Sequence, residues 1–167
     1  MTVRTPCAAV GHGAHYHSQQ NEAFFSHAPG LVLVCPRSCV QAKGLLLSSL
    51  ANKNPVIFFE PKSLYRKLEE EVPEKYYELD LFKAEVVREG QHLTMISYGA
   101  QFHIMRQAAD EYMHKHKDIS IELIDLQTVY PIDIETIEKS VKKTGRCIVT
   151  HEAPLGSGLG AEIVAQI

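Results

Sequence analysis

Short apolar segments alternate with helix-length segments along this sequence, and that alternation restricts the possible folds more than any other feature. Residues 31–35 (LVLVC) and 56–60 (VIFFE) are almost entirely apolar, and residues 40–52 between them have the length of a helix. Continuous apolar runs this short are typical of strands that are buried on both faces of a parallel sheet. Strand–helix–strand order is the repeating unit of α/β proteins. The sequence therefore predicts an α/β fold.

The same order recurs in the second half of the chain. Residues 92–99 and 119–126 are predicted as strands, and residues 100–117 as the helix that joins them. A further helix is predicted to begin after Asp133 and to end at Gly145, because Asp caps helix starts and Gly favours the turn that ends a helix.

The helix predicted at 40–52 has a candidate N-cap in Ser38. Its apolar residues lie roughly along one side. These residues are Val40, Leu46, Leu47 and Leu50.

The charge balance and the cysteines argue against several classes of protein. Seventeen Lys and Arg against 20 Asp and Glu give a net charge of −3, unlike a strongly basic nucleic-acid-binding protein. No apolar run approaches the ~18–20 residues that span a membrane. Only Cys35 and Cys39 are close among the four cysteines, so neither zinc nor a disulfide framework is predicted, and we expect a reducing compartment. Residues 1–13 lack a signal-peptide core and an amphipathic presequence, so the protein is either cytosolic or targeted by a segment outside this sequence.

Three histidines, His12, His15 and His17, lie close together in residues 10–20, which are predicted as a glycine-flanked loop. They could converge on a metal ion, but no Cys, Asp or Glu lies nearby to complete a ligand set. A catalytic histidine is better motivated, because an imidazole gives and takes protons near neutral pH. Both hypotheses remain open from these residues alone.

A second motif, residues 156–161 (GSGLGA), fits the G-x-G-x-x-A pattern of dinucleotide-binding turns. Residues 152–155 separate it from the preceding predicted strand, and the chain ends before the acidic residue expected ~20 positions later. We therefore favour a flexible loop that presents a helix N-terminus over a nucleotide site.

Three segments, residues 11–30, 36–66 and 124–154, closely resemble the beta subunits of branched-chain 2-oxoacid dehydrogenases. Pyruvate-type beta subunits share the HSQ and AKGLL motifs within them. The FFEPK-x-LYR stretch at residues 58–66 resembles the branched-chain form.

This resemblance implies two partial domains joined by a linker. Residues 1–75 would be the latter part of a thiamine-diphosphate pyrimidine-binding domain, and residues 91–167 the beginning of a transketolase C-terminal-like domain. Residues 76–90 would be the linker between them. Residues 61–84 are charged and lack a hydrophobic period, which independently indicates a boundary between domains. Both domains are expected to be incomplete.

The resemblance also implies oxidative decarboxylation of the 2-oxoacids of leucine, isoleucine and valine, with transfer of the acyl group to lipoyl groups of an acyltransferase core. Thiamine diphosphate would lie between this chain and an alpha subunit in an alpha2-beta2 assembly of the mitochondrial matrix, with Mg²⁺ on the alpha subunit. The histidine of the YHSQ motif falls on His17, near the reacting carbon, and no role carries to His15. The glutamate that activates the cofactor would lie upstream of residue 1.

A structural K⁺ site is implied as well, with ligands that map onto Ser49, Asn52 and Asn54. Helix-end carbonyl oxygens suit a hard cation. Gln127 and Cys39 depart from the family pattern, which usually has arginine and proline there. This chain alone is expected to be inactive. The alternatives are a pyruvate-type beta subunit, a non-catalytic fragment, or a nucleotide-binding α/β domain.

Overall fold

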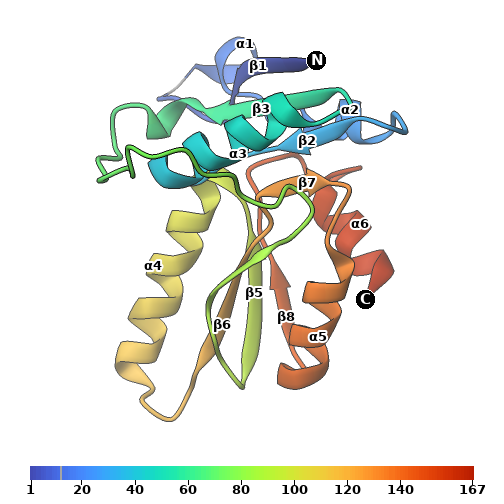
Figure 1. Ribbon diagram of the computed structural model, residues 1–167. Helices are drawn as coiled ribbons and strands as arrows, with labels where there is room; N and C mark the ends of the chain where they lie inside the picture. Colours follow the sequence, from blue (N-terminus) through green and yellow to red (C-terminus); the bar gives the residue numbers. More distant parts are fainter. Residues whose placement is uncertain (12) are drawn as a thin grey trace.

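The computed structural model describes residues 1–11 and 13–167, and within them the strands form two four-stranded sheets (Figure 1). The first sheet has the order β1-β3-β2-β7, with β1 at Thr2–Cys7, β2 at Val32–Val34, β3 at Val56–Pro61 and β7 at Thr128–Tyr130. The second has the order β4-β6-β5-β8, with β4 at Glu85–Arg88, β5 at Leu93–Ser97, β6 at Ile121–Asp125 and β8 at Cys147–Val149. Three strands in each sheet are parallel, as predicted from the apolar runs, and β4 and β7 are antiparallel to their neighbours.

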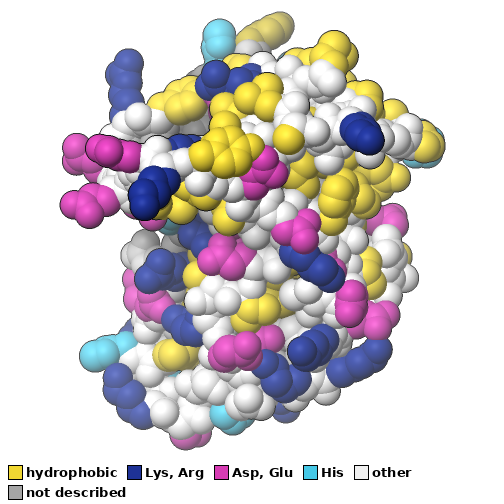
Figure 2. All heavy atoms as spheres, in the orientation of Figure 1, with side chains coloured by type: hydrophobic (Ala, Val, Ile, Leu, Met, Phe, Trp, Pro, Cys, Tyr) yellow, Lys and Arg dark blue, Asp and Glu magenta, His cyan; other side chains and the backbone are white. Residues whose placement is uncertain are grey.

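The helices lie against the faces of these sheets, and α4 and α5 flank the second sheet (Figure 1). They are α1 (Ala14–His17), α2 (Glu22–Ser26), α3 (Cys39–Ala51), the 3₁₀ helix η1 (Lys62–Leu64), α4 (Gly99–Lys115), α5 (Ile134–Thr144) and α6 (Leu159–Gln166). No helix in the described residues is both long and apolar enough to cross a membrane. On the face that Figure 2 shows, positive and negative side chains are interspersed around the second sheet, without a basic stripe.

The predicted helix caps are confirmed. Ser38 Oγ accepts a hydrogen bond from the Gln41 backbone N–H at 3.2 Å, which satisfies a donor at the start of α3. Asp133 Oδ1 accepts one from the Thr136 N–H at 3.3 Å at the start of α5. Gly145 follows α5 with a φ of +68°, the left-handed conformation that ends a helix at least cost for glycine.

The apolar side of α3 is only partly buried. Leu50 is 65% exposed, and Val40, Leu46 and Leu47 are only half-buried. The buried residues of α3 are instead Gln41, Gly44, Leu45, Ser48 and Ser49. The helix is covered on two sides. Leu45 packs against the first sheet, and another part of the chain packs against Gly44 on a different side of the helix.

That other part is the segment 73–81, which belongs to the stretch predicted as a linker or surface crossing. The Lys43 ammonium donates to the carbonyls of residues 73–75, two of them at 3.1 Å. Ser48 Oγ donates to the Leu79 carbonyl at 2.6 Å and accepts from the Leu79 N–H at 3.0 Å. Leu81, at 4% exposure, completes the apolar cluster under α3. The segment has no regular secondary structure, yet α3 holds it in place.

We predict that Gly44→Leu releases this segment. A Cβ at Gly44 would lie 2.7 Å from both Leu79 Cγ and Tyr77 Cε2, which is too close for any side chain. The free energy of unfolding is expected to fall by about 1–3 kcal/mol, although leucine favours a helix more than glycine does. Urea unfolding measures the loss, and proteolysis within residues 73–81 reports the release. The control is Ala51→Leu at an exposed site, where a loss of the same size would contradict the prediction.

Three strands were not predicted from the sequence. Residues 2–7, without an expected element, form the edge strand β1. Residues 85–88, inside the expected linker 76–90, form β4 and pair with β6. Residues 128–130 form β7. This strand belongs to the second half of the chain but pairs with β2 in the first sheet. β1 and β4 mix polar and partly exposed residues, and β7 follows β6 after only two residues, so hydrophobic periodicity did not single them out.

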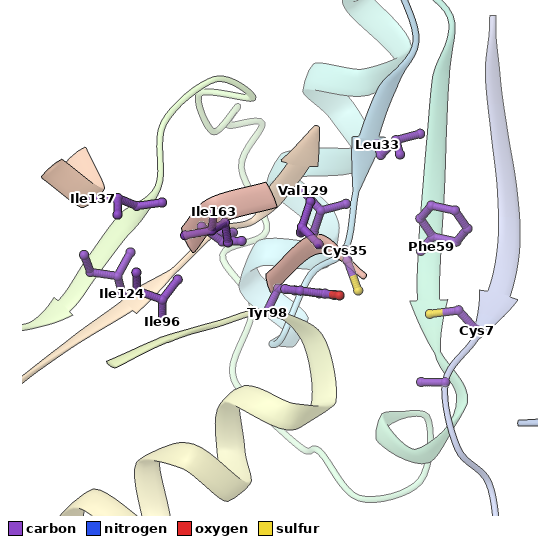
Figure 3. Close-up of a cluster of buried hydrophobic side chains, with 13 residues drawn as sticks. Cys7, Leu33, Cys35, Phe59, Ile96, Tyr98, Ile124, Val129, Ile137 and Ile163 are labelled. Atoms are coloured by element: carbon purple, nitrogen blue, oxygen red, sulfur yellow. The ribbon is translucent and has the colours of Figure 1, made fainter. Parts of the chain in front are cut away.

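The largest buried cluster lies where the two sheets meet (Figure 3). It joins Leu33 and Phe59 from the first sheet with Ile96 and Ile124 from the second, and Ile163 of α6 packs among them. The two halves therefore share an apolar core, which fixes the loops of one half relative to the other.

Candidate active-site edge

The carboxyl ends of β1, β2 and β3 meet at one edge of the first sheet, because these strands are parallel neighbours. Three segments leave that edge: residues 8–20 after β1, 35–38 after β2, and η1 after β3. Ligands of open α/β sheets bind outside this edge. His17 lies in the first of these segments.

The described residues of the segment after β1, 8–11 and 13–20, are joined by hydrogen bonds into a closed loop rather than an extended one. Ala8, with a φ of +67°, turns the chain directly after β1, and its N–H donates to the Gln19 carbonyl at 2.8 Å. Across the loop, the Val10 N–H donates to Ser18 Oγ at 3.3 Å. The prediction of an irregular loop missed α1, a single helical turn within it.

His17 ends α1, and its side chain is exposed. Its backbone carbonyl accepts a hydrogen bond from the Lys62 ammonium. Gly13 is required beneath it, because a Cβ there would lie 2.5 Å from His17 Cβ. The loop thus presents an exposed imidazole at the sheet edge, and an imidazole there can give and take protons.

The metal hypothesis finds no support from the histidines that can be described. His12 lies outside the described residues. His15 and His17 are two positions apart on one helical turn, so their rings do not face each other. Gln19 Nε2 lies 2.9 Å from the His15 ring nitrogens. In residues 1–11 and 13–167 no three His, Cys, Asp or Glu side chains gather in a way that could hold a metal ion.

A buried pair that sequence reasoning missed ties this region to the second sheet. Glu22 of α2 is 2% exposed, and its carboxylate accepts a hydrogen bond from the Tyr98 hydroxyl at the start of α4. Burial and the Glu22 charge raise the pKa of Tyr98 well above its ordinary value, so the phenol stays protonated. The two residues are 76 positions apart, and no local pattern in the sequence indicates that they pair.

Cys35 adjoins this pair within the shared core. A hydrogen bond with the Cys7 thiol, together with complete burial, raises the pKa of Cys35 well above its ordinary value. Both cysteines are free and buried. Cys35 is therefore a neutral thiol that packs in the core, without the exposed thiolate that a nucleophile needs.

Two glycines of the loop at 156–160 pack against a histidine. A Cβ at Gly158 would lie 2.8 Å from His151 Cε1, and one at Gly160 would lie 2.6 Å from His151 Nε2. The loop does present the N-terminus of α6, as favoured from the sequence, and Ser157 there has a φ of +57°. The imidazole thus occupies the space that these glycines leave open, whereas a dinucleotide turn leaves that space to phosphate.

The residues implied for K⁺ lie at the end of α3. The Ser49 carbonyl accepts a hydrogen bond from the Thr2 hydroxyl at 2.8 Å, and Asn52 Oδ1 accepts one from the Asn54 N–H at 2.8 Å. Neutral oxygen atoms at a helix end are the donor set that a hard cation takes. Ser49 and Asn52 therefore offer oxygen atoms of the chemical kind that such a site would use.

Comparison with protein families divides the chain into two matches. Residues 1–67 match the transketolase pyrimidine binding domain, and residues 82–167 match the transketolase C-terminal domain. A solved structure described as a split gene transketolase, an inactive beta4 tetramer, aligns with a TM-score of 0.79. It is 20% identical and covers 99% of this chain and 52% of that chain, so it supports the fold alone.

Two relatives are similar over the whole length of this chain. The chain is 55% identical over 167 residues to the 2-oxoisovalerate dehydrogenase subunit beta 2, mitochondrial, of Arabidopsis thaliana, and spans 46% of that protein. It is 44% identical over 168 residues to the pyruvate dehydrogenase E1 component subunit beta of Staphylococcus epidermidis, and spans 51% of it. The chain thus corresponds to about half the length of each relative.

Proposed function

This chain belongs to the transketolase family, whose pyrimidine-binding and C-terminal domains it carries in that order, and we propose that it acts as part of a branched-chain 2-oxoacid dehydrogenase beta subunit. The predicted fold class, a pyrimidine-binding domain followed by a transketolase C-terminal-like domain, is confirmed. So is the predicted resemblance to branched-chain beta subunits.

The observation that carries the proposal is an exposed imidazole, that of His17, at the carboxyl edge of a pyrimidine-binding sheet. A side chain that serves a cofactor held between two chains must remain exposed in either chain alone. Higher identity to the Arabidopsis relative than to the Staphylococcus relative favours branched-chain substrates, as does the FFEPKSLYR stretch at 58–66. A pyruvate-type beta subunit is the second candidate.

In the proposed reaction a 2-oxoacid loses carbon dioxide, and its acyl group passes to one sulfur of a lipoyl disulfide on an acyltransferase core. The disulfide bond breaks, takes up the two electrons, and leaves the second sulfur as a protonated thiol. Bound thiamine diphosphate supplies the electron sink for the decarboxylation. His17 orients the reacting groups and moves protons at its imidazole, and the closed loop 8–20 holds it in place. Mg²⁺ would lie on the alpha subunit, and the carbonyls of Ser49, Asn52 and Asn54 would hold K⁺.

The proposed assembly is an alpha2-beta2 heterotetramer in the mitochondrial matrix, and the name of the Arabidopsis relative supports the mitochondrial part. Within this chain, the proposed division places partial domains at residues 1–75 and 91–167 and a linker at 76–90. The exposed loop 8–20 would face the alpha subunit. The chain by itself is proposed to be inactive, since it lacks the alpha subunit's share of the cofactor site.

Cofactor binding tests the proposed function. A chimera in which this chain replaces the matching segment of the Arabidopsis subunit is assembled with the alpha subunit, and calorimetry measures thiamine diphosphate binding. We expect binding by this assembled enzyme and none by the 167-residue chain alone. An assembly that forms but does not bind would contradict the proposal. Binding of NAD by the chain, abolished in Gly158→Val, would favour the nucleotide-binding alternative instead.

A further inference from the structure

Lys62 joins two of the segments that leave the carboxyl edge of the first sheet. β1 and β3 are paired so that Cys7 lies opposite Pro61, and the loop 8–20 and η1 therefore begin side by side. From the first residue of η1, the Lys62 ammonium reaches across and donates to the His17 carbonyl. The contact is made to the backbone of the residue that the proposed function places at the reacting carbon.

The turn that carries His17 depends on contacts from outside itself. α1 is only four residues long, and a helix this short is not stable alone in water. No side chain caps its start at Gly13. Its last carbonyls lack helical partners, and a cation at that end is favourable for both the hydrogen bond and the helix dipole. Lys62 supplies that cation.

Lys62 itself projects from a well-held part of the chain. Glu60, two residues before it, accepts hydrogen bonds from Arg4 Nε at 2.5 Å and from the Tyr65 hydroxyl. These contacts tie the end of β3 and the turn after η1 to β1, and Lys62 lies between them. The ammonium therefore extends from a fixed base to a helical turn that is too short to be stable alone.

We propose that Lys62 is a positioning residue for His17, and that its ammonium holds the His17 carbonyl so that the imidazole keeps one orientation at the sheet edge. Lys62 acts through the backbone and touches neither substrate nor cofactor. The proposal rests on the proposed function for the role of His17, but the order of the loop can be measured without any reaction.

NMR relaxation on the 167-residue chain tests the order of the loop directly. We expect an order parameter of about 0.8 for the His17 amide, falling below about 0.6 in Lys62→Met while the amides of β3 stay rigid. Lys62→Arg keeps donors at the same site and should restore the order. Lys67→Met, at an exposed lysine five positions later, is the matched control and should leave His17 unchanged. An unchanged order parameter for the His17 amide in Lys62→Met overturns the proposal. If Lys62→Met does not fold, Lys62→Gln takes its place in the experiment.

Kinetics of the assembled enzyme test the consequence. In Lys62→Met we expect kcat to fall on the order of tenfold, because a loosened catalytic group is rarely in the productive geometry. The KM for the 2-oxoacid should stay unchanged. Lys62→Arg should recover most of kcat. A loose His17 loop with full kcat would overturn the positioning role. If His17→Ala also leaves kcat unchanged, the proposed function fails, and the NMR result still decides whether Lys62 orders the loop.

Discussion

Replacing Arg37 with methionine is expected to destabilise the chain by about 3–5 kcal/mol, because it leaves a buried carboxylate without its counter-charge. Arg37 lies after β2 in the first sheet, and Asp125 ends β6 in the second. The Asp125 side chain is fully buried and that of Arg37 is 12% exposed. Removing one member of such a pair costs far more than removing an exposed ion pair.

The contacts of Asp125 show why no other group can replace Arg37. Arg37 Nε lies 2.8 Å from Asp125 Oδ2, in an ion pair whose N–H is not aligned for a hydrogen bond. Arg37 Nη2 donates a hydrogen bond to Glu85 Oε2 at 2.7 Å. Gln41 Nε2 donates to both carboxylates, at 2.8 Å to Asp125 Oδ2 and at 2.7 Å to Glu85 Oε2. Without Arg37, one neutral amide side chain would remain between two carboxylates.

The loss in Arg37→Met is expected to depend on pH. Burial raises the pKa of Asp125 to about 6 from an ordinary 3.8, although Arg37 and Gln41 oppose the rise. The folded chain therefore holds this proton more tightly than the unfolded chain, so the contribution of Asp125 to stability decreases as pH rises from about 4 through 6. Without Arg37 the pKa rises further, and the destabilisation should be larger at about pH 7.5 than at about pH 5.

Urea unfolding of the chain at the two pH values measures this prediction. Arg106→Met is the matched control, because Arg106 is 57% exposed and lies 3.8 Å from Asp110, and it should change stability by less than about 0.5 kcal/mol. The double variant Arg37→Met/Asp125→Asn removes the buried charge and should recover most of the loss. A loss in Arg37→Met no larger than the control, or one that shrinks as pH rises, would contradict the prediction.

Local chemistry explains which parts of the fold could be predicted from the sequence. A cap such as Ser38 or Asp133, or the αL conformation of Gly145, acts within a few residues, so its pattern is visible in the chain. The buried strands β2 and β3 were visible as apolar runs for the same reason.

The parts that could not be predicted depend on contacts between distant residues. Gly44 is buried because segment 73–81 covers one side of α3, whereas Leu50 is exposed, and nothing within the helix indicates which side is covered. In the candidate site, the family resemblance singled out His17, whereas the residues alone left a metal site open beside the better-motivated catalytic histidine and did not select among the three histidines. Lys62 was not predicted, since its contact spans 45 positions.

His17→Ala in the assembled enzyme is expected to lower the rate of lipoyl acylation on the order of 100-fold, because a positioned proton-transfer group contributes at least that much in typical enzymes. Measuring the decarboxylation with a soluble electron acceptor alongside acylation separates the two steps. A larger loss in acylation assigns the imidazole to the transfer of the acyl group.

Stability is expected to remain nearly unchanged in His17→Ala, because the side chain is exposed and the contact with Lys62 is made by the backbone carbonyl. A substitution of this kind changes the free energy of unfolding by less than about 0.5 kcal/mol, which shifts Tm by no more than about 2 °C. The separation between a large loss of activity and a small change in Tm is therefore the diagnostic result. His15→Ala, on the same turn and also exposed, is the matched control and should keep its rate within about twofold. Parallel losses of Tm and activity in His17→Ala would make His17 a packing residue, and an equal loss of activity in His15→Ala would make the effect one of the loop rather than of the imidazole.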